Sequence, residues 1–142
     1  MIIHNHRRLE PSEEAAEYLK ARADIAFKLL DLAEYLPEED RVLLQAVYDR
    51  GMRPIDFARA IRARPRTIRH RVRGLMERVS SPLFQFVAAQ QGAWPIQRRL
   101  IAELTVFRGR SQREVARRLG ISLHHVRQEL IRISAQCERE RL

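Results

Sequence analysis

An internal repeat constrains the fold of this chain more than any other feature of its sequence. Glycines and apolar residues recur at a fixed offset of 58 residues, with no insertion between the copies. The matched residues are Gly51 and Gly109, Phe57 and Val115, Ala58 and Ala116, Ile61 and Leu119, Ala63 and Ile121, Ile68 and Val126, Val72 and Leu130, and Leu75 and Ile133. Because the matched apolar residues keep helical spacing, the sequence predicts two copies of one three-helix unit.

Within each copy, two short amphipathic helices are predicted on either side of a tight turn. In the second copy, Ser111 and Glu114 have the spacing of a capping box, and Ser122 is a candidate N-cap. Gly120 permits the positive φ that such a turn requires. Arg62 occupies the position of Gly120 in the first copy, so we expect its backbone to be left-handed and strained. Two helices joined in this way are typical of a helix-turn-helix.

The helix that precedes this pair in each copy is predicted to bury one apolar face. The members of that face are Val42, Leu43, Ala46 and Val47 in the first copy, and Leu100, Ile101 and Leu104 in the second. Their spacing is helical, and Gly51 and Gly109 are the natural C-terminal stops of the two helices.

The chain as a whole is predicted to be all-α, with tandem three-helix helix-turn-helix domains preceded by a long N-terminal amphipathic helix. Residues 1–36 form an arm and this acidic helix, residues 37–80 the first helix-turn-helix domain, and residues 81–142 the second. The helix begins at the candidate N-cap Ser12 and runs to about Leu36. Its apolar face is broader than one neighbouring helix usually covers, so it either packs against the first domain or forms a homodimer contact.

The charge is unevenly distributed, with an acidic N-terminal segment followed by a basic remainder of the chain. The net charge of +9 is carried almost entirely by arginine, since only Lys20 and Lys28 are lysines. Residues 1–40 hold 5 basic and 10 acidic side chains, a charge of −5, and residues 41–142 hold 22 and 8, a charge of +14. Arginine forms bidentate contacts with phosphate and guanine, so this composition favours a nucleic-acid partner.

The strongest candidate site lies in the first copy, where seven arginines fall between Arg59 and Arg73. If Ile68 and Val72 face inward, most of the polar residues around them face outward. The candidates are Arg59, Arg62, Arg64, Arg66, Thr67, Arg69, His70 and Arg73. Residues near the start of a recognition helix reach base edges, so we expect base contacts from Arg66, Arg69 and His70 and phosphate contacts from the other arginines.

The second copy carries a less basic outer face. Its candidates are Arg110, Ser111, Arg113, His124, His125, Arg127, Gln128 and Arg132. Gln128 is suited to adenine, and Arg127 to guanine or phosphate. However, Ile131 stands where Arg73 stands in the first copy, and an exposed isoleucine also suits a protein partner. From the sequence, either DNA or a protein is the partner of this copy.

Both copies resemble region 4 of bacterial sigma factors. In the first, Val42-Leu-Leu-Gln-Ala-Val-Tyr-Asp-Arg-Gly precedes Asp56-Phe-Ala-Arg-Ala-Ile and Arg66-Thr-Ile-Arg-His-Arg-Val. In the second, Glu114-Val-Ala-Arg-Arg-Leu-Gly-Ile-Ser with His125-Val-Arg is similar. The resemblance covers residues 36–79 and 95–135. It implies binding to the upstream promoter element in the major groove and contact with the flap of RNA polymerase. No segment resembles the promoter-melting region 2, so a complete sigma factor is not expected.

The predicted function is therefore a sequence-specific DNA-binding transcription regulator, and not an enzyme. The carboxylates are isolated, with no histidine or cysteine constellation beside them, and no glycine-rich phosphate loop occurs. Response-regulator effector domains and transposase DNA-binding domains share features with the two copies. The alternatives are accordingly a protein-binding adaptor of RNA polymerase with auxiliary DNA contact, or a DNA-binding subunit of a transposase or recombinase system.

No cofactor or metal is expected. His4 and His6 are two residues apart, but no further ligands follow, which favours a solvated arm. Cys137 is the only cysteine, which excludes an intramolecular disulfide and a cysteine metal site. In the absence of a membrane-spanning apolar run or a signal-type core, we expect a cytoplasmic, nucleoid-associated protein without membrane contact.

Overall fold

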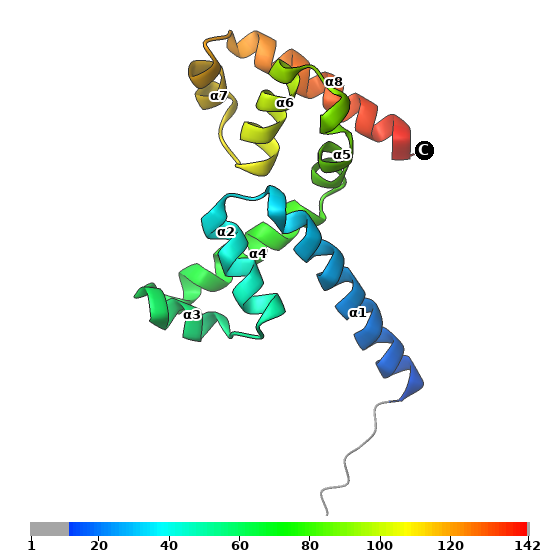
Figure 1. Cartoon of the computed structure of the whole chain (residues 1–142), viewed down its shortest axis with the longest axis vertical. Helices are drawn as coiled ribbons and strands as arrows, with labels where there is room; N and C mark the ends of the chain where they lie inside the picture. The colour runs from blue at the N-terminus through cyan, green and yellow to red at the C-terminus, as the bar shows by residue number, and fades with distance from the viewer. Residues whose placement is uncertain (1–11, 142) are drawn as a thin grey trace, which may run out of the picture.

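The described part of the chain is built from helices and the turns that join them (Figure 1). The structure is a computed structural model that describes residues 12–141, apart from the side chains of residues 18–27. Its α-helices are α1 (Glu13–Leu32), α2 (Glu38–Leu44), α3 (Pro54–Ile61), α4 (Pro65–Ser80), α5 (Pro82–Gln90), α6 (Ile96–Ala102), α7 (Gln112–Leu119) and α8 (Leu123–Arg141). The predicted all-α class is confirmed. The arm predicted for residues 1–11, with His4 and His6, lies outside the described residues.

The offset of 58 residues also relates the helix boundaries. It relates α2 to α6 and α3 to α7, and it relates the first residue of α4 to the first residue of α8. The short segments follow it as well: the 3-10 turns are Ala33–Tyr35 and Gln91–Ala93, and the π-helical turns are Gln45–Asp49 and Glu103–Phe107. We call residues 28–80 the first unit and residues 82–141 the second unit. In Figure 1 the first unit lies below the second, and the N-terminal end of α1 projects away from both.

Helix α1 begins as expected and ends earlier than expected. The Ser12 Oγ accepts a hydrogen bond of 3.2 Å from the backbone N–H of Ala15, which confirms the N-cap. The α-helix ends at Leu32 and not near Leu36, because a 3-10 turn follows and Leu36 is extended before Pro37. This end of α1 belongs to the core of the first unit, in which Leu29, Ala33 and Leu36 are buried.

The turns between paired helices have the same left-handed backbone in both units. Gly120 has φ 66° and ψ 34°, and Arg62 has φ 58° and ψ 39°. Arg62 is the only residue other than glycine with a positive φ in the described range. The expected left-handed Arg62 is therefore confirmed. Arg62 stands at the C-terminal end of α3, in a left-handed conformation that glycine adopts without steric cost.

Replacing Arg62 with glycine is expected to stabilise the protein by about 1 kcal/mol, because the left-handed conformation costs an L side chain that much. The measurement is the free energy of unfolding in guanidinium chloride. The matched control is Gly120→Ala, which is expected to lose a similar amount. Its added Cβ would meet no atom within 4 Å, so only the backbone conformation is changed. An Arg62→Gly protein no more stable than the parent would contradict the strain.

Serine caps begin α7 and α8. The Ser111 Oγ accepts a 3.2 Å bond from the N–H of Glu114, and the Ser122 Oγ accepts a 3.0 Å bond from the N–H of His125. The reciprocal bond of the predicted capping box is absent from the bonds of the described residues. The Glu114 carboxylate lies instead 3.6 Å from Arg110 and 3.4 Å from Arg118, because arginines four residues away on either side attract it.

The apolar faces of α2 and α6 are rotated relative to the prediction. Leu43 and Ile101 are buried as expected, but Val42 is 47% exposed and Leu100 is 37% exposed. The neighbouring residues Leu44 and Ala102 are buried as well. The placement of Val42 and Leu100 in the core was therefore wrong. The same error occurs in both units, since Leu44 and Ala102 occupy equivalent positions and both lie in the apolar core.

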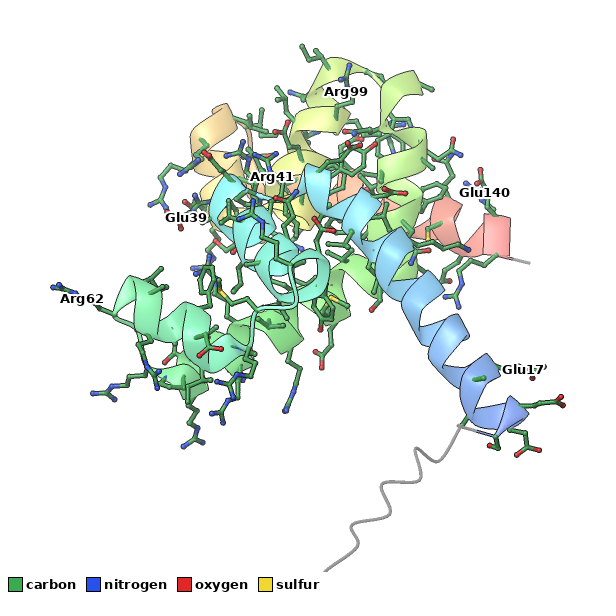
Figure 2. The ribbon with its side chains drawn as sticks, turned by 60° about the horizontal axis from the view of Figure 1, so that its bottom comes forward. Glu17, Glu39, Arg41, Arg62, Arg99 and Glu140 are labelled. Carbon is green, nitrogen blue, oxygen red and sulfur yellow. The ribbon has the colours of Figure 1, made fainter. Side chains whose placement is uncertain are left out.

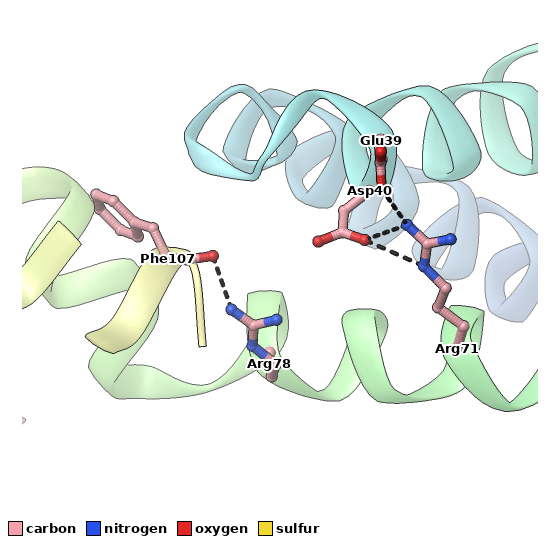
Figure 3. Close-up of polar contacts among 5 residues, drawn as sticks. All are labelled: Glu39, Asp40, Arg71, Arg78 and Phe107. Carbon is pink, nitrogen blue, oxygen red and sulfur yellow. Dashed lines mark hydrogen bonds and ion pairs between the residues drawn. The ribbon is translucent and has the colours of Figure 1, made fainter. Parts of the chain in front are cut away.

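An ion pair joins α2 to α4 in the first unit and α6 to α8 in the second, and its polarity is reversed between the units. In the first unit, Arg71 on α4 donates a 2.7 Å bond to Asp40 on α2 (Figure 3). In the second unit, Arg98 on α6 donates a 2.6 Å bond to Glu129 on α8. Asp40 and Arg98 are equivalent under the offset, and so are Arg71 and Glu129. The repeat therefore conserves the position of the pair and exchanges its charges.

Candidate nucleic-acid interface

The basic surface of the first unit is formed by α3, the turn after it, and the outer face of α4. Helix α4 starts at Pro65, whose fixed φ suits the first turn, after the extended residue Arg64. The inner face of α4 is buried through Ile68, Val72, Leu75 and Val79, as the spacing predicted. The opposite face is therefore held toward solvent by the core itself.

All the candidates of the first unit lie on this surface and are exposed. They are Arg59 on α3, Arg62 and Arg64 in the turn, and Arg66, Thr67, Arg69, His70 and Arg73 on α4. In Figure 2, Arg62 points away from the body at the tip of α3. The structure thus brings together residues from two helices and one turn into one continuous cationic surface.

The arginines of this surface lack a carboxylate partner in the part of the chain that the structure describes. Among the described residues, none of the six arginine candidates of the first unit forms an ion pair with a carboxylate. Arg71 differs from them because it turns inward to Asp40. These six guanidinium groups therefore have hydrogen-bond donors that no carboxylate of the described residues occupies, and phosphate or base oxygens are acceptors that suit such donors.

One ion pair lies at the edge of this surface, at the start of α3. The Nε of Arg53 donates a 2.9 Å bond to the Asp56 carboxylate, and this bond lowers the pKa of Asp56 below its ordinary value. The same bond raises the pKa of Arg53. Asp56 also supplies negative charge to the first turn of α3. Both groups are satisfied locally, so we do not count Arg53 with the free arginines.

The candidates of the second unit are divided between solvent and internal partners. Four of them hold internal contacts. Ser111 caps α7, the ring Nε2 of His125 lies 2.9 Å from the amide oxygen of Gln97, Arg110 lies near Glu114, and Arg132 lies 3.4 Å from Glu129. The remaining four, Arg113, His124, Arg127 and Gln128, are exposed and have no polar side-chain partner among the described residues. The second surface is therefore less cationic than the charge of its sequence indicates.

An apolar residue lies on this second surface. Ile131 is 63% exposed on α8, at the position that Arg73 occupies on α4. An exposed isoleucine gains free energy when another apolar surface covers it, whereas it contributes little to a contact with phosphate. This difference between the units is one of chemistry and not of backbone, because the offset relates α3 to α7 and the first residue of α4 to the first residue of α8.

The functional reading of the sequence missed the internal roles of three arginines. Arg71 and Arg98 form the exchanged ion pairs, and Arg78 donates to backbone carbonyls of the second unit. The exchanged pair had a signal in the sequence, since the offset places an acid against a base at both positions. No signal in the sequence indicated the role of Arg78, because its partners are backbone carbonyls 28 and 29 residues away.

Other kinds of site have little support in the described residues. They contain no group of three or more histidine, cysteine or acidic side chains placed to hold a metal ion. Cys137 is buried, and the helices of the described range include none with the length and apolar character needed to cross a bilayer. Comparison of the chain with family models, curated protein sequences and solved structures finds no match.

Proposed function

We propose that this protein is a sequence-specific double-stranded DNA-binding regulator of transcription, with two tandem helix-turn-helix units. The observation that carries the proposal is the surface of six arginines on α3, the following turn and α4, which no carboxylate of the described residues neutralises. On this proposal α4 enters the major groove, which is wide enough for an α-helix. The resemblance to sigma region 4 in both copies supports the same assignment.

The local geometry supports a helix-turn-helix at α3 and α4. A turn of three residues, Arg62 to Arg64, joins the helices, and the N–H of Ala63 donates a 2.8 Å bond to the carbonyl of Ala58. The equivalent bond in the second unit, from Ile121 to Ala116, is 3.1 Å. A short closed turn of this kind holds the second helix at a fixed angle to the first, as a recognition helix requires.

Position along α4 assigns a role to each side chain. Arg66, Arg69 and His70 lie in its first two turns, so they are the proposed base contacts. Arg59, Arg62, Arg64 and Arg73 flank them and are the proposed phosphate contacts, which position the helix without specifying sequence. Gly74 follows on the same side and leaves open space, since a Cβ there would meet nothing within 4 Å.

The affinity for duplex DNA is expected to fall steeply with salt. Each phosphate contact releases condensed counterions, so the four proposed phosphate contacts give a slope of log affinity against log salt of about −4. Between about 50 mM and 200 mM salt the affinity should fall about 10²-fold. Fluorescence anisotropy on a labelled duplex measures this. The triple variant R59A/R62A/R64A should lower the slope by about 3, since three contacts are lost.

The matched control removes arginines elsewhere. Arg139 and Arg141 are exposed at the end of α8, and R139A/R141A should leave the slope nearly unchanged. A wild-type affinity that is insensitive to salt would refute the proposal. Equal loss of slope in both variants would show that total charge, and not the surface at α3 and α4, drives binding.

One observation favours a second function, in which the second unit binds a protein. Ile131 is exposed, and four of the eight candidates in this unit are occupied by internal contacts. In this alternative the chain is an adaptor of RNA polymerase with auxiliary DNA contact. A pull-down with core polymerase tests it directly. The variant H124A/Q128A discriminates, because it would leave DNA affinity intact if the second unit serves a protein.

A further inference from the structure

The junction between the two units is short and conformationally restricted. A single residue, Ser81, separates α4 from α5, and it is extended with φ −67° and ψ 142°. Pro82 begins α5 and restricts the backbone of Ser81 to this region. The Ser81 Oγ also accepts a 3.2 Å bond from the N–H of Phe84, which caps α5. The covalent link between the units therefore has little freedom to bend.

Aromatic side chains from both units meet beside this junction. The ring of Phe107, in the second unit, has its centroid 5.0 Å from that of Tyr35 in the first unit and 5.0 Å from that of Phe84. Phe84 and Phe107 are almost completely buried. They belong to one continuous apolar core that extends from Leu29 in the first unit to Ile133 in the second. Rotation of one unit against the other would separate these rings and expose them.

Arg78 adds a polar clamp at the same place. It lies on the last turns of α4, and one terminal nitrogen of its guanidinium donates to the carbonyl of Phe107 at 2.7 Å (Figure 3). The same nitrogen donates to the carbonyl of Val106 at 3.1 Å. Carbonyls at the end of a helix have no partner within that helix. Arg78 therefore provides hydrogen-bond donors for carbonyls at a helix end of the second unit.

The lack of a side chain at Gly109 leaves room for the guanidinium of Arg78. A Cβ on Gly109 would lie 3.2 Å from the Cζ of Arg78, which is closer than most real contacts of this kind. The equivalent Gly51 has open space around its missing Cβ. The residue equivalent to Arg78 under the offset is Gln136, and a glutamine carries no guanidinium. The clamp is therefore a feature of the junction and not of the repeat.

We propose that Arg78 is a positioning residue that locks the two units at one angle, so that the protein reads a bipartite DNA site whose two halves have a fixed separation. This inference rests on the proposed DNA binding. In Figure 1, α3 and α7 lie on the same side of the molecule. With the junction locked, both helix pairs can then contact one duplex at the same time. Once the first unit has bound, a rigid link makes binding of the second unit to the same duplex intramolecular. The resulting gain in affinity is lost when the separation of the two half-sites does not match the geometry of the protein.

The first arm of the experiment needs no DNA. Residual dipolar couplings of the wild-type protein should give one alignment tensor for both units. In Arg78→Met, which keeps the aliphatic chain and removes the donors, the two tensors should differ. Gly109→Ala displaces the guanidinium and should act in the same direction, whereas Arg78→Lys should restore a single tensor in part. The matched control is Gln136→Met, which should leave one tensor. Separate tensors in the wild type, or one tensor in both Arg78→Met and Gly109→Ala, would overturn the locking role.

The second arm measures the spacing requirement on DNA. Duplexes are selected from a random pool with the wild-type protein, and about 5 or 10 base pairs, half a turn or a full turn, are then inserted between the two protected halves. The wild type should lose about 10²-fold in affinity at either insertion. Arg78→Met should bind the original site more weakly and tolerate the full-turn insertion. Equal tolerance in wild type and variant would refute the fixed separation. A pool from which no duplex is selected would refute DNA binding itself, and the couplings would still decide the locking role.

Discussion

The double variant R66A/R69A is expected to abolish the sequence preference of the protein and to lower its affinity for the preferred duplex by about 10² to 10⁴-fold. A good bidentate contact to a base contributes about 1–3 kcal/mol of discrimination, and two such contacts are removed. Both side chains are exposed on the outer face of α4, opposite the buried Ile68 and Val72. The fold should therefore be unaffected, and loss of binding would report on the interface alone.

The measurement compares dissociation constants for a selected duplex and for a scrambled duplex of equal length. For R66A/R69A the two constants should converge. The matched control is R64A/R73A, which removes the same charge from proposed phosphate contacts and should weaken binding to both duplexes by the same factor. If R66A/R69A kept its preference while R64A/R73A lost it, the reading residues would be the flanking arginines, and the assignment along α4 would be wrong.

Replacing Arg98 with alanine is expected to destabilise the protein by about 3–5 kcal/mol, since it leaves a buried carboxylate without its main partner. Glu129 is the buried charged residue of the described range, with 8% of its surface exposed. Its carboxylate accepts a 2.6 Å bond from Arg98 and lies 3.4 Å from the more exposed Arg132. Arg132 alone cannot replace a short bond from a side chain that is itself largely enclosed.

Chemical denaturation followed by circular dichroism measures the loss, and two controls identify its cause. The charge-exchanged variant R98D/E129R copies the polarity of Asp40 and Arg71 and should recover most of the stability. Asp40→Ala should cost less, about 1 kcal/mol, because the partly exposed Arg71 can turn to water and to Glu39, 3.9 Å away. A loss below about 1 kcal/mol for Arg98→Ala would mean that Arg132 or water satisfies Glu129.

The exchanged polarity also bears on how the repeat folds. The offset relates α2 to α6 and the start of α4 to the start of α8, so a helix of one unit could pack in the place of its equivalent in the other. Such mispairing would place Asp40 against Glu129, or Arg98 against Arg71, and like charges in close contact are unfavourable. The exchange thus favours correct pairing of helices within each unit.

Several features of the fold were predictable because they depend on residues close in the chain. Serine caps satisfy donors three residues away, as Ser12, Ser111 and Ser122 do. The left-handed turn at Arg62 followed from its equivalence to Gly120, since a shared backbone imposes its conformation on whichever residue occupies it. The outer face of α4 followed from the spacing of the buried residues on its inner face.

The exposure of Val42 and Leu100 was not predictable in the same way. Helical spacing gives the direction of an apolar face, but the neighbours that cover it decide its width and centre. In both units the covered side is shifted toward the following residue, Leu44 or Ala102. The number of free arginines in the second unit could not be predicted from the sequence for a related reason. Whether an arginine faces water or a carboxylate depends on rotamers and neighbours that composition does not contain.

The sequence by itself determined the all-α class, the repeat and the arginine-rich face, because each arises from local periodicity or from comparison of the chain with itself. Only the tertiary structure decided which arginines remain free, since Arg71 and Arg98 are taken up by carboxylates 31 residues away. It alone placed Arg78 on the carbonyls of Phe107 and Val106. The physical reason is that ion pairs and clamps between units are contacts between distant segments, whose approach depends on the packing of the whole core.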